Sequence, residues 1–305
     1  MNAGTQIAGG LAGRVSSATV IRCGEPLSKH TTLRVGGPAD MYVEPASEED
    51  LAGVLKFCRE CGLPFFVMGR GSNLLVRDGG FRGVVICLAH ANFSRIKAGS
   101  ERLRCGAGAK LKSVAAGAKR NGLSGMEFLE GIPGTVGGAL RMNAGAMGGA
   151  TFDVVESVRL MNFDGIVHEL TSGEMSVAYR SCPTLKVRIA LSAVFKGAPA
   201  PRGEIENRMK TFSEKRWASQ PAAPSAGCLF KNPEKIPAGK LIDELGLKGT
   251  RVGGAMVSVK HGNFIVNDGK ATARDVLKLI AILQRRARDE RGVELQTEVE
   301  IMGAD

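Results

Sequence analysis

Gly69-Arg70-Gly71-Ser72-Asn73-Leu74 follows the apolar run Phe65-Phe66-Val67-Met68, and this stretch decides the fold. It begins like the GxGxxG fingerprint of a Rossmann domain, but the third glycine is missing. Leu74-Leu75-Val76 predicts a strand where a Rossmann domain would begin a helix, which argues against that fold. A glycine turn with consecutive amides and a serine hydroxyl can still bind a pyrophosphate. A plain turn between two strands is the alternative interpretation.

The surrounding pattern predicts alternating strands and helices. Residues 39–68 are typical of a strand, a helix with Ser47 as N-cap and Asp50 three residues on, and a buried strand at 65–68. Thr272 and Asp275 mark the start of another helix in the same way, and Asp164-Gly165 indicates a hairpin turn. We expect an α+β or mixed α/β protein with a boundary near residue 200 and a weaker one near 86. Further elements are expected as helices at 109–121, 203–217 and 272–291, a hairpin at 154–170, and strands at 188–196 and 293–301.

The composition indicates a folded protein of more than one domain. The chain has 305 residues, 44% apolar and 23% charged, and no apolar run approaches the ~20 residues of a transmembrane helix. Residues 1–20 lack the pattern of a signal peptide, and we expect a loose, disordered leader there. Seven cysteines without a framework indicate reduced thiols. Cys58 and Cys61 form one CxxC pair, which favours the end of a helix over a zinc site because no second pair accompanies it.

The net charge of +11 calls for an anionic partner or a solvated basic surface. Nucleic-acid binding is disfavoured because the basic residues are dispersed and aromatic residues make up only 5% of the chain. Small polyanionic ligands such as dinucleotides and sugar nucleotides fit a dispersed excess better. Charge alone does not decide between these classes.

Four further stretches carry residues suited to chemistry. Gly131–Ala139 and Met142–Ala146 are rich in small residues, which lets backbone lie against a flat or charged ligand. Tyr179-Arg180-Ser181 and Ser225–Pro233 supply an arginine, a lysine, an asparagine and the thiol of Cys228, which suit a substrate bearing a carboxylate. Taken singly, each has an ordinary structural interpretation as an exposed side chain or a buried filler. No GK[ST] sequence occurs, so NTP hydrolysis is disfavoured.

In this order the segments resemble the UDP-N-acetylenolpyruvoylglucosamine reductase family. The resemblance spans about residues 20 to 302 and is specific as an ordered set. It also includes the following stretches: His30–Ala39, Ala238–Asp243, Arg251–Ala255, His261–Asn267 and Leu295–Val299.

The resemblance implies an FAD-binding fold of the vanillyl-alcohol-oxidase (PCMH) type in two subdomains, followed by an α+β substrate domain. The expected ranges are 1–20 for the leader, 21–86 and 87–200 for the FAD-binding subdomains, and 201–305 for the substrate-binding domain. The cofactors implied are FAD and NADPH. The residues expected along FAD are Arg34, Gly69, Arg70, Gly71, Ser72, Asn73, Leu74, Gly134, Thr135, Gly137, Gly138, Asn143 and Ala144.

The family reaction implies catalytic roles for Arg180, Cys228 and Glu298. NADPH reduces the flavin, hydride passes from flavin N5 to C3 of the enol ether of UDP-N-acetylglucosamine enolpyruvate, and a proton is added at C2 to give UDP-N-acetylmuramate. Arg180 would bind the carboxylate and stabilise the enolate-like intermediate. Glu298 would assist that polarisation, as a protonated acid or through a hydrogen bond. Cys228 stands where the family usually has serine, and as a stronger acid a thiol is compatible with proton donation.

The same resemblance implies the substrate contacts and the setting of the protein. The expected substrate-binding residues are Tyr179, Arg216, Lys231, Asn232 and Lys240, some of them on the UDP diphosphate. His261 and Asn263 match the family or simply pack the domain. One branch of the family has an inserted lid between the positions of Arg180 and Cys228. Only 47 residues separate the two here, which leaves little room for a lid and indicates the lid-less branch. A cytoplasmic monomer acting in peptidoglycan precursor synthesis is expected, without metal, nucleic acid or membrane as partner.

Two alternatives stay open at this stage. One is another flavin oxidoreductase of the same fold that oxidises an alcohol or hydroxy acid, with His90 or Cys105 as a covalent flavin anchor. The other is a basic, non-enzymatic protein that binds anions or nucleic acid, which would not need the glycine clusters at 69–71, 131–149 and 252–254.

Overall fold

The computed structural model describes residues 3–305, with side chains from Ala8 onward. The chain forms two compact units. Unit 1 contains the residues up to Cys23 together with Met41–Arg70 and Gly83–Lys215. Unit 2 contains Gly24–Asp40, Gly71–Arg82 and Arg216–Asp305. In the described part of the chain, no helix has both the length and the apolar character that a membrane span requires.

The first sheet has the strand order β1-β2-β5-β3, formed by β1 (Val20–Pro26), β2 (Pro38–Glu44), β5 (Phe81–Cys87) and β3 (Phe65–Met68). β3 pairs with β5 in parallel, with Phe65 opposite Val84. The expectation of a fully buried strand at 65–68 is wrong for three of the four residues, since only Met68 is buried. The reason is the position of β3 at the edge of the sheet.

Helix α2 (Glu48–Glu60) forms as predicted. The hydroxyl of its N-cap Ser47 accepts a hydrogen bond from the Asp50 amide at 3.1 Å, and Leu51 and Cys58 lie on its buried face. Cys58 and Cys61 lie at the end of this helix, as the helical interpretation of the CxxC pair predicts. Where a disordered leader was expected, the structure has helix α1 (Ala3–Ala12), because Leu11 is fully buried in the apolar core of unit 1. Residues 1–2 of that leader lie outside the described residues.

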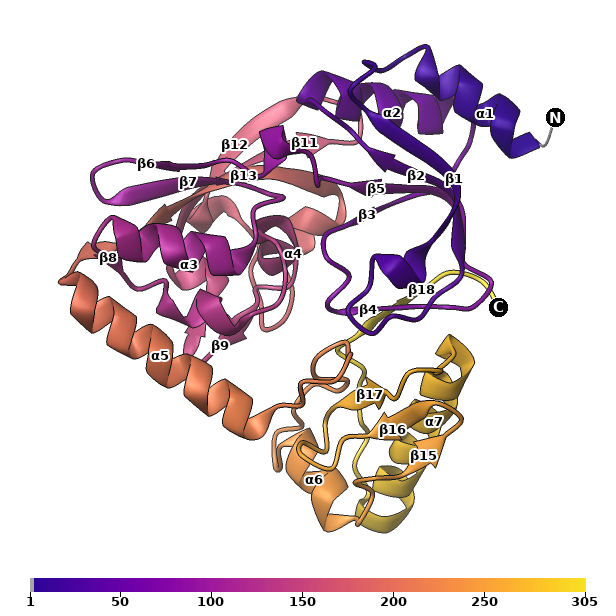
Figure 1. The fold of residues 1–305 in the computed structure, drawn as a ribbon, viewed down its shortest axis with the longest axis vertical. Coiled ribbons are helices and arrows are strands. Elements are labelled where there is room, and N and C mark those ends of the chain that lie inside the picture. The colour runs from indigo at the N-terminus through magenta and orange to yellow at the C-terminus, as the bar shows by residue number, and fades with distance from the viewer. Residues whose placement is uncertain (1–2) are drawn as a thin grey trace. The chain divides into compact units, whose positions relative to one another are not determined.

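The second sheet is antiparallel, with the order β12-β11-β13-β7-β6 (Figure 1). The predicted hairpin and the predicted strand at 188–196 are both confirmed. Alternate side chains such as Leu103, Cys105 and Phe195 are fully buried on one face, where α3 and α4 pack. The elements are β6 (Ile96–Ala98), β7 (Arg102–Gly106), β11 (Val155–Asn162), β12 (Val167–Thr171), β13 (Arg188–Lys196), α3 (Leu111–Arg120) and α4 (Val136–Arg141).

Short elements complete unit 1. The pairs β8 (Leu123–Ser124) with β14 (Ala198–Pro199) and β9 (Gly145–Ala146) with β10 (Gly149–Ala150) are two-residue ladders. The predicted helix at 203–217 is confirmed as α5 (Arg202–Ser219), whose last four residues belong to unit 2.

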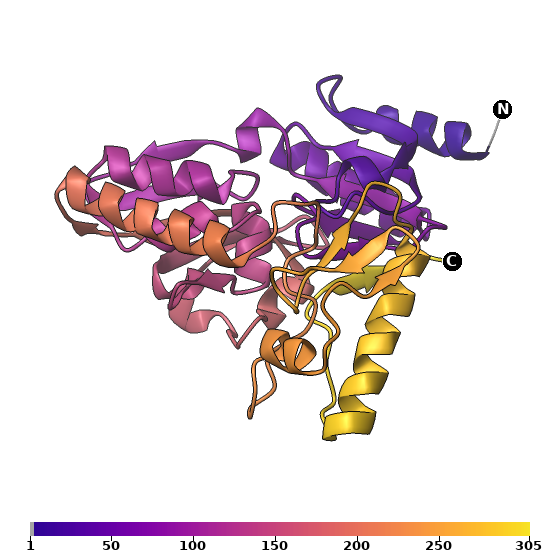
Figure 2. The ribbon, with the colours of Figure 1, turned by 60° about the horizontal axis from the view of Figure 1, so that its bottom comes forward.

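Unit 2 contains a three-stranded antiparallel sheet and two helices. The strands are β15 (Arg251–Val252), β16 (Ala255–Val257) and β17 (Ile265–Asn267), and the shorter helix is α6 (Ala238–Glu244). Helix α7 (Ala273–Arg291) begins with the predicted capping box and runs along this sheet (Figure 2). Strand β4 (Leu74–Val76) pairs in parallel with β18 (Glu300–Met302), so the strand expected after the glycine turn is confirmed.

The strand expected at 293–301 is largely wrong, since β18 begins only at Glu300. The residues before it bond as separate bridges to the segment after Cys228: the oxygen of Gln296 accepts from the Lys231 amide at 2.9 Å, and Thr297 bridges Phe230. Leu295 and Val299 are buried, so the apolar alternation is real. The buried residues of this alternating segment pack against loops, and the segment does not form a continuous β-ladder.

Candidate active site

The first half of the glycine turn lies in unit 1 and packs on the start of α4. A Cβ on Gly69 would lie 2.5 Å from Oγ1 of Thr135, which is tighter than real Cβ contacts allow. Thr135 is the N-cap of α4 but makes no capping hydrogen bond with its side chain. Gly69 therefore has to stay without a side chain for the backbone and the Thr135 hydroxyl to lie side by side.

The second half of the turn lies in unit 2 and admits glycine alone at position 71. Gly71 has a φ of +59°, and a Cβ there would lie 2.4 Å from the backbone oxygen of His30. The Thr32 amide donates to the Gly71 oxygen at 3.2 Å. This close packing against His30 and Thr31 requires glycine at position 71 and fixes the path of the turn. A fixed glycine turn is the kind of backbone that can present amides to a pyrophosphate.

Asn73 connects the turn to the end of the chain. Its side-chain amide donates to the backbone oxygen of Glu298 at 3.1 Å, and its own carbonyl accepts from the Glu300 amide at 3.0 Å. A Cβ on Gly227 would lie 3.8 Å from the backbone oxygen of Ser72. Within unit 2, Ser72 and Asn73 of the flavin turn thus lie beside the segments that carry Cys228 and Glu298. Arg180, the third residue expected in catalysis, belongs to unit 1.

The small-residue segment after α4 is held by Asn143. Asn143 has a φ of +39°, accepts from the Phe152 amide at 3.2 Å and donates to the Ala178 oxygen at 3.4 Å. The carbonyl of Ala144 accepts from both the amide and the hydroxyl of Thr151. Both residues, expected along the cofactor, hold the backbone in place, and Asn143 ties it to the turn that carries Arg180.

Tyr179 and Arg180 are the two central residues of a tight turn closed by a bridge between Ala178 and Ser181. Arg180 has a φ of +55°, and Nη2 donates to the Gly145 oxygen at 3.4 Å. Its guanidinium carbon lies 5.1 Å from the centre of the Tyr179 ring. A Cβ on Gly145 would lie 3.3 Å from Nη1, so the glycine leaves room for the arginine.

Cys228 and Glu298 lie on adjacent segments of unit 2. The Glu298 amide donates to the Leu229 oxygen at 2.7 Å, and the Leu229 amide donates to the Asn263 oxygen at 2.9 Å. The side chain of Asn263 bonds both backbone groups of Phe230, at 2.9 and 2.8 Å. Cys228 and Glu298 are each half-buried, so both can meet a ligand. Asn263 is buried and holds this segment, which is the packing role that the sequence left open.

The charge of Arg216 interacts with the ionised form of Cys228. Burial lowers the pKa of the Arg216 guanidinium, and the negative charge of an ionised Cys228 acts in the opposite direction. By reciprocity the guanidinium stabilises the thiolate form of Cys228. In residues 3–305, no carboxylate lies within ion-pair distance of Arg216. An anionic ligand can therefore pair with this guanidinium without displacing a carboxylate.

The remaining expected substrate residues differ in their setting. Lys231 is half-buried, and its amide donates to the Gln296 oxygen. Asn232 accepts from the Ala238 amide at 3.1 Å, which ties it to the start of α6. Lys240 is exposed and pairs with Glu244 at 3.8 Å on α6. The structure gives Asn232 and Lys240 partners of their own, and their contacts with substrate stay predictions.

Arg34 is exposed and has a φ of +58°. The loop that carries it is held by Asn267, whose amide donates to the oxygens of Leu33 at 3.0 Å and Arg34 at 3.4 Å, and by the Thr32 hydroxyl, which donates to the Ser225 oxygen at 2.6 Å. Sequence reasoning gave Asn267 and Thr32 no role of their own. Thr32 lies in His30–Ala39 and Asn267 in His261–Asn267, two stretches that carry the family resemblance. Their position in these stretches was the one sign in the sequence that they matter.

Two other features bear on the alternatives. Burial raises the pKa of Cys105 to about 12, and its side chain is fully buried, so it is poorly placed to be a covalent flavin anchor. Across residues 3–305, no three His, Cys, Asp or Glu side chains gather in a way that could hold a metal ion.

Comparison with known proteins decides the family. The family model "FAD binding domain" matches residues 39–171, and the C-terminal domain of UDP-N-acetylenolpyruvoylglucosamine reductase matches residues 220–302. The chain is 44% identical over 287 residues to the protein named UDP-N-acetylenolpyruvoylglucosamine reductase from Clostridioides difficile, covering 93% of this chain and 94% of the relative. It is 45% identical to the protein of that name from Geobacter metallireducens, covering 92% and 93%.

The chain belongs to the UDP-N-acetylenolpyruvoylglucosamine reductase family.

The family assignment agrees with the fold. The crystal structure of the Thermus caldophilus reductase (MurB) superimposes with a TM-score of 0.79 at 40% identity, covering 93% of this chain and 99% of that one. A glucose-oxidase variant of the grass pollen allergen Phl p 4 matches 64% of this chain with a TM-score of 0.50 at 14% identity, which shows the fold alone. The predicted α+β fold of the PCMH type is confirmed. The turn carries no side chain at Gly69 and Gly71, which is compatible with the FAD pyrophosphate expected there.

Proposed function

We propose that this protein is an FAD-dependent oxidoreductase that reduces UDP-N-acetylglucosamine enolpyruvate to UDP-N-acetylmuramate, with NADPH as the reductant. Membership of the reductase family over 93% of the chain supports the reaction. The observation that carries the proposal lies in unit 2. Asn73 of the flavin turn donates a hydrogen bond to the Glu298 oxygen, and the Glu298 amide donates to the oxygen of Leu229, the residue after Cys228.

The flavin, when bound, supplies the hydride, and the residues of the chain supply charge, orientation and a proton. Arg180, held by its turn and by the Gly145 oxygen, binds the substrate carboxylate and stabilises the negative charge that develops on it. Glu298 polarises the same group by donating a hydrogen bond in its protonated form. Tyr179, exposed beside Arg180, contacts the substrate.

Cys228 donates the proton to C2. Donation requires the thiol form, and the nearby Arg216 makes the thiol a stronger acid by stabilising the thiolate that is left behind. Arg216 and Lys231 are half-buried cations of unit 2, and their charge suits the UDP diphosphate. The flavin is bound without a covalent anchor, which separates this function from an alcohol oxidase of the same fold.

We further propose a cytoplasmic monomer of the lid-less branch, organised as two FAD-binding subdomains at 21–86 and 87–200 and a substrate-binding domain at 201–305. The anionic partners of its basic surface are the nucleotides of this reaction rather than nucleic acid.

A steady-state assay tests the proposal. The purified protein should oxidise NADPH only when UDP-N-acetylglucosamine enolpyruvate is present, and mass spectrometry should find a product heavier than the substrate by two hydrogens. NADPH oxidation that proceeds with oxygen alone and leaves the sugar nucleotide unchanged would reject the proposed substrate. A protein purified without flavin and inactive with added FAD would favour the non-enzymatic alternative.

A further inference from the structure

Unit 1 contains a hollow of about 300 Å³ that shares no residue with the candidate active site. Its most deeply buried lining side chains are Phe93 and Leu191, which are 4% and 2% exposed. The volume lies at the lower end of the range for small-molecule sites, ~300–1,000 Å³. The full lining consists of Ser47, Glu48, Glu49, Asn92, Phe93, Arg95, Lys97, Arg104, Gly106, Leu191 and Ser192.

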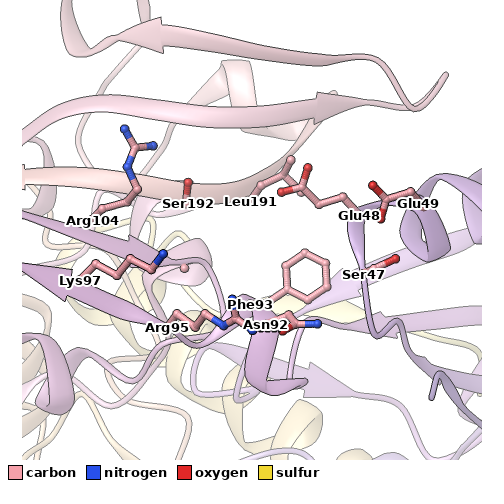
Figure 3. Close-up of a pocket in the computed structure, with 11 residues that line it drawn as sticks. Ser47, Glu48, Glu49, Asn92, Phe93, Arg95, Lys97, Arg104, Leu191 and Ser192 are labelled. Carbon is pink, nitrogen blue, oxygen red and sulfur yellow. Dashed lines mark hydrogen bonds between the residues drawn. The ribbon is translucent and has the colours of Figure 1, made fainter.

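Three cations gather on one wall of the hollow (Figure 3). Lys97 and Arg104 are direct partners in the antiparallel pairing of β6 with β7. The Gly106 amide donates to the Arg95 oxygen at 2.9 Å, which extends the same ladder by one step. Arg95 and Lys97 are two residues apart and therefore point to the same face. Like charges placed directly opposite on a sheet repel, and a bound anion would relieve this repulsion. Water screens part of it already, because all three cations are exposed.

The carboxylates of the protein offset little of this charge. The only carboxylate that reaches Arg104 in residues 3–305 is Glu169, at 4.0 Å, and Arg95 donates to the neutral Asn92 side chain at 2.6 Å. No carboxylate of the described chain lies within ion-pair distance of Lys97.

A second like-charge pair in the same sheet, on β7 and β13, provides an internal comparison. Arg102 on β7 stands directly opposite Lys196 on β13. There Glu156 pairs with Arg102, with Oε2 at 2.8 Å from Nη2 and both carboxylate oxygens within 3.0 Å of Nε. The charge of Lys196 also acts on this carboxylate. The fold thus places a carboxylate in close contact with one pair, whereas the pair at the hollow has only Glu169, at 4.0 Å from Arg104.

The opposite wall carries Glu48 and Glu49 (Figure 3). Glu48 forms an ion pair with Arg159. The pKa of Glu49 is lowered by a backbone hydrogen bond at the start of α2 and by the Ser47 hydroxyl, so Glu49 is a charged acceptor. This wall suits the hydroxyl groups of a ligand and repels a second anionic group.

We propose that this hollow binds a small sugar phosphate. The phosphate lies between Lys97 and Arg104 with Arg95 beside it, because a phosphate accepts hydrogen bonds from guanidinium and ammonium groups and removes their mutual repulsion. The sugar lies over Phe93 and Leu191, with its hydroxyls facing Glu49 and Ser192. The size of the hollow suits one sugar ring rather than a dinucleotide.

Isothermal titration calorimetry of the full-length, flavin-loaded protein with glucose 1-phosphate tests the site, with glucose and inorganic phosphate as separate probes. We expect saturable binding of glucose 1-phosphate, weaker binding of inorganic phosphate and none of glucose. The double variant K97S/R104S should weaken binding at least about tenfold. The double variant R102S/K196S removes the same charge from the same sheet and should leave binding within about twofold.

A single variant separates binding from folding. Lys97→Glu replaces the repulsion with Arg104 by attraction, so its melting temperature should equal or exceed that of the wild type while binding is lost. The site is refuted if glucose 1-phosphate does not bind saturably, or if R102S/K196S weakens binding as much as K97S/R104S. Equal affinity for inorganic phosphate and glucose 1-phosphate would refute the sugar part of the proposal.

Discussion

The side-chain amide of Asn73 donates to the backbone oxygen of Glu298 at 3.1 Å, and the Glu300 amide returns a hydrogen bond to the Asn73 carbonyl at 3.0 Å. Asn73 therefore fixes the segment of Glu298 to the turn expected to hold the flavin pyrophosphate. Glu298 in turn bonds to the Leu229 oxygen, next to Cys228. A position in the cofactor turn is thereby coupled to two positions proposed to act on the substrate.

Replacing Asn73 should affect both stability and catalysis. Asn73→Ala removes the bond to the Glu298 oxygen, and we expect a loss of about 1 kcal/mol in the free energy of unfolding. Turnover should fall more than this loss explains, because Glu298 is no longer held. Urea unfolding and steady-state kinetics measure the two effects. Asn121→Ala, which removes a bond of similar kind to the Gly117 oxygen in α3, should reduce stability alone.

Gly71 and Gly24 provide a matched test of the cofactor turn. Both have positive φ, +59° and +63°, but a Cβ on Gly71 meets the His30 oxygen at 2.4 Å whereas a Cβ on Gly24 meets nothing within 4 Å. Gly71→Ala should lower the flavin content of the purified protein severely, while Gly24→Ala should cost only the ~1 kcal/mol of the left-handed conformation. The ratio of flavin to protein absorbance reports the difference. Equal flavin content in both variants would speak against a cofactor role for this turn.

Cys228 can be tested as the proton donor by two substitutions. Cys228→Ser keeps a donor and should retain turnover, whereas Cys228→Ala should reduce the substrate half-reaction by ~10²–10⁴-fold. Reduction of the flavin by NADPH should be unchanged in both. Stopped-flow measurement of the two half-reactions separates these effects. A Cys228→Ala protein with normal flavin reoxidation by substrate would show that another group donates the proton.

Arg216 should determine how readily the Cys228 thiol ionises. Because the guanidinium stabilises the thiolate, Arg216→Met should shift the pH dependence of Cys228 alkylation by iodoacetamide to higher pH. The reaction rate rises with pH as the thiolate forms, so the variant reacts more slowly than the wild type near neutrality. Lys240→Met removes an exposed cation paired with Glu244 and should leave the profile unchanged.

Asp50 should make the protein sensitive to acid. Burial raises the pKa of Asp50, but hydrogen bonds from Ser16 and Thr19 outweigh it, and the net shift is downward. A carboxyl whose pKa is lowered by folding contributes stability above its unfolded value, near ~3.9, and loses it as the pH falls below that value. The difference in unfolding free energy between the wild type and Asp50→Asn should therefore shrink between about pH 5 and 3. A difference independent of pH would contradict this account.

Local signals in the sequence predicted the elements that local interactions determine. Ser47 with Asp50 and Thr272 with Asp275 marked the starts of α2 and α7, because an N-cap bonds within its own first turn. Leu74-Leu75-Val76 predicted a strand and thereby excluded a Rossmann domain.

Non-local pairing explains what the sequence could not predict. The alternation at 293–301 suggested a strand, but Gln296 and Glu298 bond to Lys231 and Leu229, which lie far away in the sequence. The left-handed conformations of Asn143 and Arg180 depend on partners such as Phe152 and Gly145. The juxtaposition of Lys97 with Arg104 follows from strand register, which no single segment reveals.

Two anaerobic half-reactions test the central claim most directly. The purified protein is first reduced with NADPH and then mixed with UDP-N-acetylglucosamine enolpyruvate, while the flavin absorbance is followed. We predict that NADPH bleaches the flavin and that the enolpyruvate restores its colour in stoichiometric amount. Bleaching without recovery would contradict the proposed substrate, and a protein whose flavin NADPH does not bleach would contradict the proposed reductant.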